Sequence, residues 1–259
     1  MGIFIFKIYS LTTYLIFIFS WIVIGIVTGL YLLRKAAPYG RYHTDKWGPV
    51  VSNRLGWFLM EATVMAAFAA WIPFRRFNWH TPATVMIILF FIHYLHRSLV
   101  YPLLIRTKGK KMPLIIMLAA MIFNLVNGSL LGSWFADFAH YPESWYSSPL
   151  FICGTLLFVS GMLINRTADY HLIHLRKSGE TGYQIPQGGL FRWVSSPNLL
   201  GEIIEWGGFA LLTWSLPGLA FFIWTCANLL PRALANHRWY QQKFPAYPPG
   251  RKRLLPFIW

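Results

Sequence analysis

The stretch IYSLTTYLIFIFSWIVIGIVTGLYLL, residues 8–33, decides the fold, because it is mostly apolar and contains no charged side chain. A helix needs about 20 predominantly apolar residues to cross a bilayer, and this run is long enough. It is also longer than the apolar core of a secretory signal peptide, which has about 7–15 residues. We therefore expect a retained membrane helix rather than a segment that is removed.

The composition of the whole chain indicates that its solvent is lipid. Of its 259 residues, 56% are hydrophobic and only 12% are charged, whereas soluble domains have about 25% charged residues. The net charge of +15 sits in the segments between apolar runs, so it indicates membrane topology rather than a nucleic-acid-binding face. The two cysteines, Cys153 and Cys226, both lie in apolar runs and suggest neither a disulfide framework nor a cysteine-rich metal site.

The apolar runs predict an all-α, polytopic integral membrane protein with about seven transmembrane helices. The runs are residues 8–33, 55–74, 81–105, 112–135, 148–164, 199–214 and 218–230. The last three are short, and such helices tilt or lie partly at the membrane interface. No internal repeat stands out, so residues 1–259 are treated as one membrane-embedded domain.

The distribution of positive charge predicts how these helices are oriented. Nearly all of the 23 Lys and Arg residues fall in alternate connections or after the last span. The opposite side has only Lys7, Arg75 and Arg76, while Arg97 lies within a span. Because cytosolic loops carry an excess of Lys and Arg, we expect the N-terminus outside and the C-terminus in the cytosol.

Ionisable side chains inside the spans are the first candidates for function. Glu61 lies in the second predicted span, where an ionised carboxylate costs about 2–3 kcal/mol. The spacing i, i+3, i+7 places Tyr94, Arg97 and Tyr101 on one face of the third span, and we expect that face to turn away from lipid. A buried Glu61–Arg97 pair that only locks two helices together is the structural alternative, and both roles can coexist.

A second set of polar groups is expected at the cytosolic membrane face. Glu202 and Glu205 lie three residues apart near the end of the sixth span and are expected to form one acidic face. The segment 165–183 adds amide, carboxylate, guanidinium, imidazole and phenol groups, from Asn165, Arg166, Asp169, Tyr170, His171, His174, Arg176, Lys177 and Tyr183. This mixture suits the ribose hydroxyls and phosphates of a nucleotide. For any single residue, the alternative is a solvated, cation-rich loop at the lipid headgroups.

Two further motifs carry little weight. His93 and His96, with His171 and His174, have the spacing of a histidine-rich di-iron site, but such a site needs about eight converging histidines. The chain has 8 histidines in total and scatters several of them, so no metal site is expected. The pair Gly188-Gly189 lacks both the GxGxxG spacing and a preceding strand, so no Rossmann domain is expected.

The most specific motifs lie in the C-terminal third of the chain. Residues 183–191 read YQIPQGGLF, residues 194–198 read VSSPN and residues 201–206 read GEIIEW. The tail adds Arg232, His237, Arg238, Tyr240, Phe244 and the string RKRLLPF at residues 251–257. With residues 165–180, HYLHR at residues 93–97 and WFLME at residues 57–61, these motifs closely resemble the steroid 5α-reductase (3-oxo-5-alpha-steroid 4-dehydrogenase) family, in order and over nearly the whole chain.

The resemblance implies an oxidoreductase acting on CH–CH bonds, which uses NADPH to reduce the Δ4 double bond of 3-oxo-Δ4-steroids to 5α-dihydrosteroids. Hydride would pass from the nicotinamide to C5 of the steroid. The resemblance also implies a seven-helix membrane bundle, in which residues 1–137 mainly form the substrate pocket and residues 148–259 mainly bind the cofactor. It implies no metal, no nucleic acid and no obligate protein partner.

The resemblance assigns roles to individual positions as well. Glu61 and Tyr94 are the implied catalytic pair that holds the 3-oxo group, and Trp57 and Arg97 lie beside the substrate. The implied cofactor-binding residues are Asn165, Asp169, Arg176, Tyr183, Asn198, Glu202, His237 and Tyr240. Hydride addition to an enone moves negative charge onto the carbonyl oxygen, so donors fixed at that oxygen stabilise the transition state. Whether Glu61 is protonated for this role or paired with Arg97 is open at this point.

Three positions depart from the family's pattern. Met60 stands where relatives often carry Gln, which removes one partner of Glu61 and affects how the substrate is oriented. Gln184 and Asn236 replace an expected Arg and His, and so alter the cofactor contacts. The 2′-phosphate of NADPH needs a cation, for which Arg176, Lys177 or a tail arginine is available. NADPH itself is inferred from the resemblance and not from spacing.

Other functions stay open. A trans-2-enoyl-CoA reductase or another lipid enone reductase shares the hydride chemistry. A membrane methyltransferase, to which the C-terminal half is distantly similar, needs no intramembrane carbonyl donor, so Glu61 and Tyr94 argue against it. A transporter or channel would use Glu61, His93, His96 and Arg97 as an ion path, which leaves the cytosolic polar groups unexplained. The membrane would be the endoplasmic reticulum in a eukaryote and the inner membrane in a bacterium.

Overall fold

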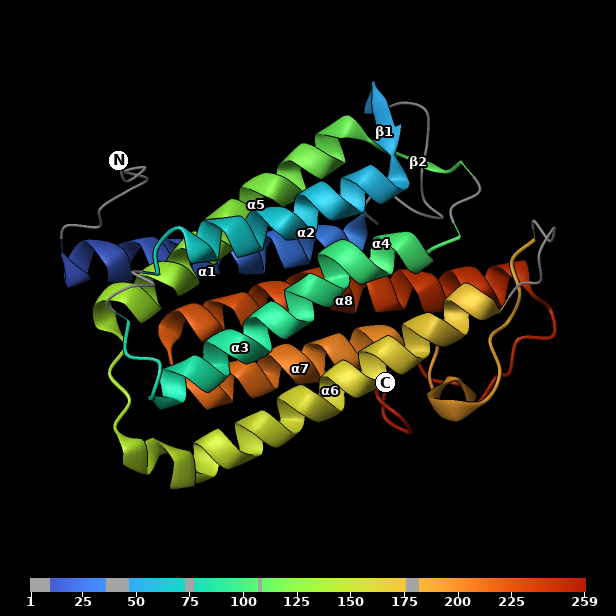
Figure 1. Ribbon diagram of the computed structural model, residues 1–259. Helices are drawn as coiled ribbons and strands as arrows, with labels where there is room; N and C mark the ends of the chain where they lie inside the picture. The colour runs from blue at the N-terminus through green and yellow to red at the C-terminus, as the bar shows by residue number, and fades with distance from the viewer. Residues whose placement is uncertain (1–9, 36–46, 73–76, 107–108, 176–181) are drawn as a thin grey trace.

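The computed structural model describes residues 10–35, 47–72, 77–106, 109–175 and 182–259. Within them the chain forms seven long helical segments that run side by side (Figure 1). Their bounds are α1 Leu11–Arg34, α2 Asn53–Ala69, α3 Pro82–Leu95 continued by η3 His96–Val100 and α4 Tyr101–Leu104, α5 Leu114–Ser133 continued by η4 Trp134–Phe138, α6 Pro149–His174, α7 Pro197–Thr213 and α8 Leu216–Lys243. The short elements are β1 Val50–Ser52, β2 Lys111–Pro113, η5 Glu143–Ser147 and η6 Gly189–Arg192.

The helices confirm a polytopic, all-α membrane protein. Five of the described segments, α1, α3–α4, α5–η4, α6 and α8, are long and apolar enough to cross a bilayer. Helices α2 and α7 have 17 residues each, which is at the short end for a crossing. On α1, large apolar side chains such as Phe17, Val23 and Val27 are exposed, and lipid is the solvent that accommodates such a surface. Each predicted apolar run corresponds to one helical segment, while a crossing by all seven stays a prediction.

Two helices extend further than their apolar runs predict. The fifth run ends at residue 164, but α6 continues to His174, and the seventh ends at residue 230, but α8 continues to Lys243. A helix requires only its backbone hydrogen bonds, so it continues where hydropathy stops. Asn165 and Asp169 therefore lie on a rigid helix rather than on a loop. The antiparallel ribbon β1–β2, in which Val51 pairs with Met112, is another element that the sequence did not predict.

Helices α6 and α7 pack antiparallel with their backbones in contact, because glycines line their interface. Gly154 and Gly161 on α6 lie against Gly208 and Gly201 on α7. A methyl group at Gly154 would lie 2.5 Å from the backbone nitrogen of Leu212, well inside van der Waals contact. Small residues allow helices to approach this closely. The contact brings the last turns of α6 beside the first turns of α7.

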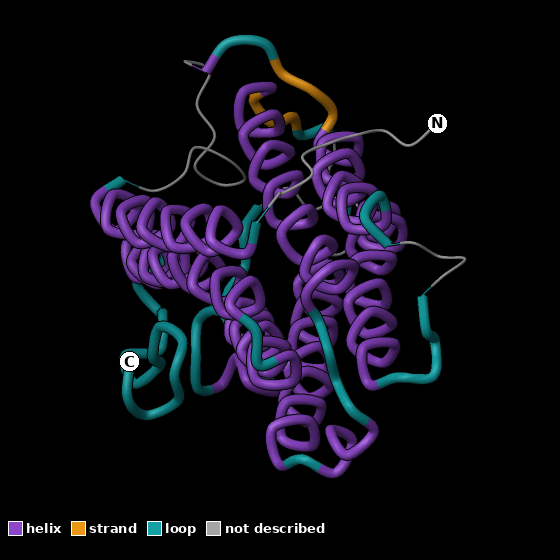
Figure 2. Tube along the Cα trace, turned by 90° about the vertical axis from the view of Figure 1, so that its left-hand side faces the viewer, coloured by secondary structure: helices purple, strands orange, loops and turns teal. Residues whose placement is uncertain are grey.

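The centre of the bundle is an aromatic core. Phe68 from α2, Phe90 from α3, Phe158 from α6, and Trp206 and Phe209 from α7 pack in one buried cluster. The ring of Phe90 lies 4.6 Å from that of Phe68 and 5.9 Å from that of Trp206, between centroids. Aromatic side chains bury the largest area per residue, so this cluster holds the helices together. Figure 2, which views the helices nearly end-on, shows how they group around this interior.

The third helical segment contains a π-turn. The amide of Tyr101 donates to the carbonyl of His96, five residues earlier. Pro102 comes next, and because proline lacks an N–H and its ring collides with the carbonyl four residues back, the regular pattern cannot continue there. The π-turn at residues 96–100 carries Arg97, and such turns are frequent at functional sites.

Candidate functional site

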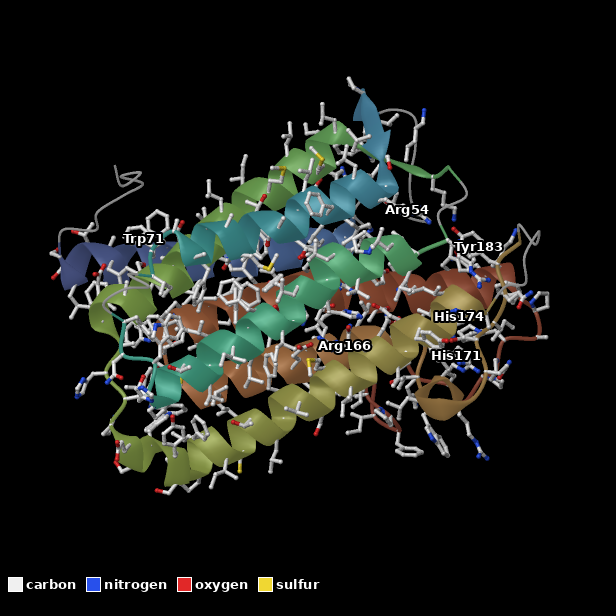
Figure 3. All side chains as sticks on the ribbon, in the orientation of Figure 1. Arg54, Trp71, Arg166, His171, His174 and Tyr183 are labelled. Carbon is white, nitrogen blue, oxygen red and sulfur yellow. The ribbon has the colours of Figure 1, made fainter. Side chains whose placement is uncertain are left out.

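A cavity of about 480 Å³ lies inside the bundle. Helices α2, α5, α6, α7 and α8 and the third helical segment all contribute to its lining, together with Tyr183 from the segment before α7. Figure 3 shows Arg54, His174 and Tyr183 at one end of the bundle and Trp71 toward the other. The end of the cavity at Tyr183 is therefore the end that the charge distribution predicts to be cytosolic.

Most of the predicted site residues line this cavity. They are Trp57, Glu61, Tyr94, Arg97, Asp169, Tyr183, Asn198, Glu202 and Tyr240. Asn165 and His237 are buried behind the lining and contact it through hydrogen bonds. Arg176 and Lys177 lie outside the described residues. The prediction that Tyr94, Arg97 and Tyr101 share an inward face is confirmed, since all three line the cavity.

Arg97 is the centre of the charged groups in the cavity. Its Nη1 lies 2.8 Å from Oδ2 of Asp169, and its Nη2 lies 3.4 Å from Oε2 of Glu202. The distance from its Nε to Oε1 of Glu61 is longer, at 4.0 Å. The Glu61–Arg97 pair of the structural alternative is therefore present, but it is the longest of the three contacts, and Arg97 ties the third helical segment more closely to α6 and α7. The guanidinium also stacks over the ring of Trp57 at 5.0 Å, a cation–π contact.

Two asparagines fix the carboxylates that hold Arg97. Nδ2 of Asn198 donates to Oδ1 of Asp169 at 2.9 Å. Nδ2 of Asn165 donates to the carbonyl of Asn198 at 3.0 Å and lies 3.4 Å from Oε2 of Glu202. Each carboxylate thus has both a cation and an amide partner, which is what burial of charge requires. The close α6–α7 contact places these four side chains within reach of one another.

Glu61 and Tyr94 differ from their charged neighbours. Both side chains line the cavity, and among the described residues neither forms a side-chain hydrogen bond; the nearest charged partner of Glu61 is Arg97, at 4.0 Å. The Tyr94 ring is held by Phe90 at 4.7 Å and Trp206 at 5.5 Å, between ring centroids. Packing fixes the position of the phenol while its hydroxyl group stays available to a ligand, so the pair has the character of a preorganised polar site in an apolar wall.

His93 and Glu205 form a separate buried pair. Nδ1 of His93 lies 2.7 Å from Oε1 of Glu205, whose side chain is 0% exposed. The prediction that Glu202 and Glu205 form one acidic face is therefore wrong, because Glu202 lines the cavity while Glu205 points to α3. Among the described residues, no three His, Cys, Asp or Glu side chains gather as ligands of a metal ion would.

Asn124 is a buried polar residue that sequence reasoning missed. It lines the cavity from α5, and its Nδ2 donates to the carbonyl of Met60 at 2.7 Å. Met60, which replaces the Gln expected at this position, packs with Met112 and Met117. A lone Asn in an apolar helix was the available signal, since such residues usually bond across helices.

Positively charged side chains line the cavity near Tyr183. Two of them come from the connection between α4 and β2, whose charges the sequence analysis used only to predict topology. Arg106 and Lys110, between α4 and β2, line the cavity together with Arg232 of α8. Lys110 donates from Nζ to the Tyr183 hydroxyl at 3.2 Å and lies 5.0 Å from the centre of that ring. Side chains distant in sequence thus place positive charge beside a predicted cofactor-binding phenol.

The tail closes around Ser195. The Ser195 hydroxyl lies 2.6 Å from Nδ1 of His237 and 2.6 Å from the Tyr247 hydroxyl, and it donates to the Lys252 carbonyl at 3.0 Å. Burial raises the pKa of the Tyr247 phenol, so this group stays protonated at neutral pH. His237 thus supports Ser195, which lines the cavity, rather than lining it itself. Asn236, at the position where His was expected, lies 3.3 Å from the Ser196 hydroxyl.

A polar cavity among helices with apolar outer surfaces defines an integral membrane protein with a candidate ligand site within its bundle. Comparison with known proteins gives its family. The family model described as 3-oxo-5-alpha-steroid 4-dehydrogenase matches residues 110–259. The chain belongs to this family of oxidoreductases, as the motifs in the sequence predicted.

Several relatives are similar over nearly the full length. The chain is 41% identical to the steroid 5-alpha-reductase DET2 of Gossypium hirsutum in an alignment 262 positions long, which covers 96% of this chain and 95% of that protein. It is 41% identical to the 3-oxo-5-alpha-steroid 4-dehydrogenase 1 of Bos taurus over 240 residues, covering 91% and 93%. It is 45% identical to the 3-oxo-5-alpha-steroid 4-dehydrogenase 2 of Homo sapiens over 230 residues, covering 86% and 89%.

Proposed function

We propose that this protein uses NADPH to reduce the Δ4 double bond of 3-oxo-Δ4-steroids, giving 5α-dihydrosteroids. The observation that carries the proposal is the pair Glu61 and Tyr94, whose side chains line the cavity without a side-chain hydrogen bond to any other residue in the described ranges. The membership of the chain in the 3-oxo-5-alpha-steroid 4-dehydrogenase family supports the reaction class.

Glu61 and Tyr94 hold the 3-oxo group of the substrate. Negative charge grows on this oxygen as the β-carbon of the enone is reduced, so two donors fixed at the oxygen stabilise the transition state more than the ground state. Glu61 acts as a donor in its protonated form. Asp169 and Glu202 hold the Arg97 guanidinium at 2.8 and 3.4 Å, closer than Glu61 does at 4.0 Å, so Glu61 is the least firmly paired of the three carboxyl groups.

Arg97 and Trp57 orient the substrate side of the cavity. Arg97 stacks on Trp57 and is bonded to Asp169, so it connects the substrate wall with residues from the cofactor half. A planar cation held between a ring and two carboxylates has little freedom to rotate. The two groups together keep the wall beside Glu61 in one position.

The cavity lining suits NADPH. Arg106, Lys110 and Arg232 supply cations for phosphate groups, and Tyr183, Tyr240 and Asn198 supply hydroxyl and amide groups for ribose and nicotinamide. When bound, this cofactor would supply the hydride that adds to C5, and a proton from water would then add to the α-carbon, C4, to complete the reduction. Asp169, Glu202 and Asn165 position this part of the lining, and His237 does so through Ser195. Residues 1–137 are proposed to form mainly the substrate side and residues 148–259 mainly the cofactor side.

The cation-rich end of the bundle is proposed to face the cytosol. NADPH would then enter at the end marked by Tyr183, and the steroid would reach Glu61 from the apolar interior. The N-terminus would lie on the side of the membrane opposite the cytosol. The membrane would be the endoplasmic reticulum membrane in a eukaryote and the inner membrane in a bacterium.

The test measures NADPH consumption by the purified protein with testosterone or progesterone and identifies the product by mass spectrometry. We expect a 5α-dihydro product and its loss in Glu61→Gln. Glu143→Gln, which neutralises an exposed carboxylate in η5, is the matched control and should keep full activity. Tight NADPH binding without turnover, combined with turnover of a trans-2-enoyl-CoA, would contradict the steroid assignment, and full activity of Glu61→Gln would contradict the role of Glu61.

A further inference from the structure

An exposed apolar surface lies outside the helices, where η6 meets the tail. This surface, the tail patch, consists of Leu190 and Trp193 from η6 and its C-cap, and Leu255, Phe257 and Ile258 from the tail. Phe257 is 71% exposed and Ile258 is 79% exposed. The rings of Trp193 and Phe257 lie 4.9 Å apart between centroids, so the two segments form one continuous surface. Contiguous exposed apolar groups of this kind mark an interaction site.

The tail patch is continuous with the side of the bundle and does not project beyond its end. Leu254 is buried against Leu199 and Leu200 at the start of α7, and Trp259 packs on the same cluster. In Figure 1 the C-terminus lies within the length of the helices, and in Figure 2 it lies outside them, beside the bundle. The patch therefore lies level with the first turns of α7, where that helix is expected to enter the membrane.

The charges around the tail patch are positive. The Arg192 guanidinium lies 5.1 Å from the Trp193 ring, and the Arg253 guanidinium lies 5.3 Å from the Trp259 ring. Lys252 is adjacent in the chain, and residues 207–259 contain no Asp or Glu. An exposed tryptophan, Trp193, and a partly buried one, Trp259, each with an arginine beside its ring, match the interfacial region of a bilayer, where rings reach the acyl boundary and cations meet lipid phosphates.

The backbone conformation of Phe257 is a further indication that its side chain contacts a partner outside the protein. Its φ is 66°, in the left-handed region that non-glycine residues rarely adopt. The turn is closed by the amide of Trp259 donating to the carbonyl of Leu255 at 3.1 Å. Apart from the contact with Trp193, strain that leaves Phe257 71% exposed gains little in water, whereas it is compensated if the ring enters lipid.

We propose that the tail patch inserts into the headgroup layer of the bilayer and that anionic phospholipid is its partner. Insertion would also act on the cavity. Ser195 donates from its amide to the Lys252 carbonyl, and Arg251 donates to the Pro186 carbonyl at 3.1 Å, so the tail holds the segment that carries Ser195 into the lining. The bilayer thereby becomes part of the support of the ligand cavity.

Site-directed spin labelling of the full chain in lipid nanodiscs tests this proposal. The label is placed at Ile258→Cys, after Cys153 and Cys226 are replaced by Ala. Ile258 is exposed, so its replacement disturbs no packing. Gln242→Cys, at an exposed position near the end of α8, is the matched control. The probes are molecular oxygen, which concentrates in lipid, and a water-soluble nickel chelate. Nanodiscs contain phosphatidylcholine alone or an equal mixture with phosphatidylglycerol.

In the mixed bilayer, we expect the label at position 258 to be accessible to oxygen and shielded from nickel. Its ratio of oxygen accessibility to nickel accessibility should be several-fold higher than that of the label at position 242. In phosphatidylcholine alone the label at position 258 should be shallower. Nickel access equal to that at position 242 in the mixed bilayer would overturn the proposal. Shielding from both probes would also overturn it, because it would mean that protein, such as a second copy of the chain, covers the patch. Equal depth in both bilayers would overturn the assignment of anionic lipid.

Discussion

Arg97 and Asp169 lie 2.8 Å apart, Nη1 to Oδ2, although 72 positions separate them in the sequence. Arg97 comes from the π-turn of the third helical segment, and Asp169 comes from the part of α6 that extends beyond its apolar run. The contact joins the half of the chain that carries Glu61 and Tyr94 to the half that carries Asn198 and Tyr240. The geometry of the cavity therefore depends on one buried cation.

Replacing Arg97 by Met should destabilise the protein strongly. The change leaves Asp169 and Glu202 buried without their cation, which costs about 3–5 kcal/mol. The free energy of unfolding, measured by titration with denaturing detergent, should fall by that amount. Adding Asp169→Asn should restore part of the loss, because it removes one of the unpaired charges. A single variant as stable as the parent would contradict this role of Arg97, because it would show that solvent satisfies Asp169 and Glu202 without it.

A larger side chain at Gly161 should separate α6 from α7. A methyl group at this position would overlap the backbones of Glu205 and Gly201, and such overpacking costs about 1–3 kcal/mol. We expect Gly161→Ala to lower the free energy of unfolding and, by moving Asn165 away from Asn198, to weaken cofactor binding. Gly250→Ala is the control, because no atom lies within 4 Å of the added group. Equal behaviour of the two variants would contradict the packing.

His93 and Glu205 should be energetically coupled. Their polar atoms are 2.7 Å apart and both side chains are buried, so each single replacement strands its partner. In a double-mutant cycle with His93→Phe and Glu205→Met, we expect a coupling energy of about 1–3 kcal/mol in unfolding. Additive effects would mean that the pair contributes no mutual stabilisation.

Lys110→Met should raise the KM for NADPH by about tenfold, which corresponds to about 1.4 kcal/mol, with little change in kcat. The replacement removes a cation at the cavity mouth and the hydrogen bond to the Tyr183 hydroxyl. Lys243→Met removes one positive charge at the end of α8, and its KM should stay unchanged. An unchanged KM for Lys110→Met would show that this cation does not contact the cofactor.

The inward face of the third helical segment could be predicted because helical periodicity is local. The i, i+3, i+7 spacing of Tyr94, Arg97 and Tyr101 is enough to show that the three share a side. Which carboxylates Arg97 meets could not be predicted in the same way, since Asp169 and Glu202 come from helices whose arrangement depends on the glycine contacts between α6 and α7.

The role of Lys110 and the extent of α6 were missed for a different reason. Positive charge in a connecting segment was read as a topology signal, and nothing in its spacing shows that Lys110 reaches Tyr183. Hydropathy locates the part of a helix that lies in lipid but not where the helix ends, so the fifth apolar run ends at residue 164 and does not show that α6 continues past Asp169 to His174. The family motifs identified Tyr183, which Lys110 contacts, and Asn165, which lies one turn before Asp169 on α6. They did not show which residues these side chains contact.

The most direct test of the account follows hydride transfer with NADPH that carries deuterium at the transferred position. The purified protein is incubated with a 3-oxo-Δ4-steroid, and the position of the label in the product is determined by NMR. We predict deuterium at C5 on the α face, with transfer lost in both Glu61→Gln and Tyr94→Phe although NADPH still binds. Deuterium at another carbon, or unchanged transfer in these two variants, would contradict the proposal that Glu61 and Tyr94 hold the carbonyl while C5 is reduced.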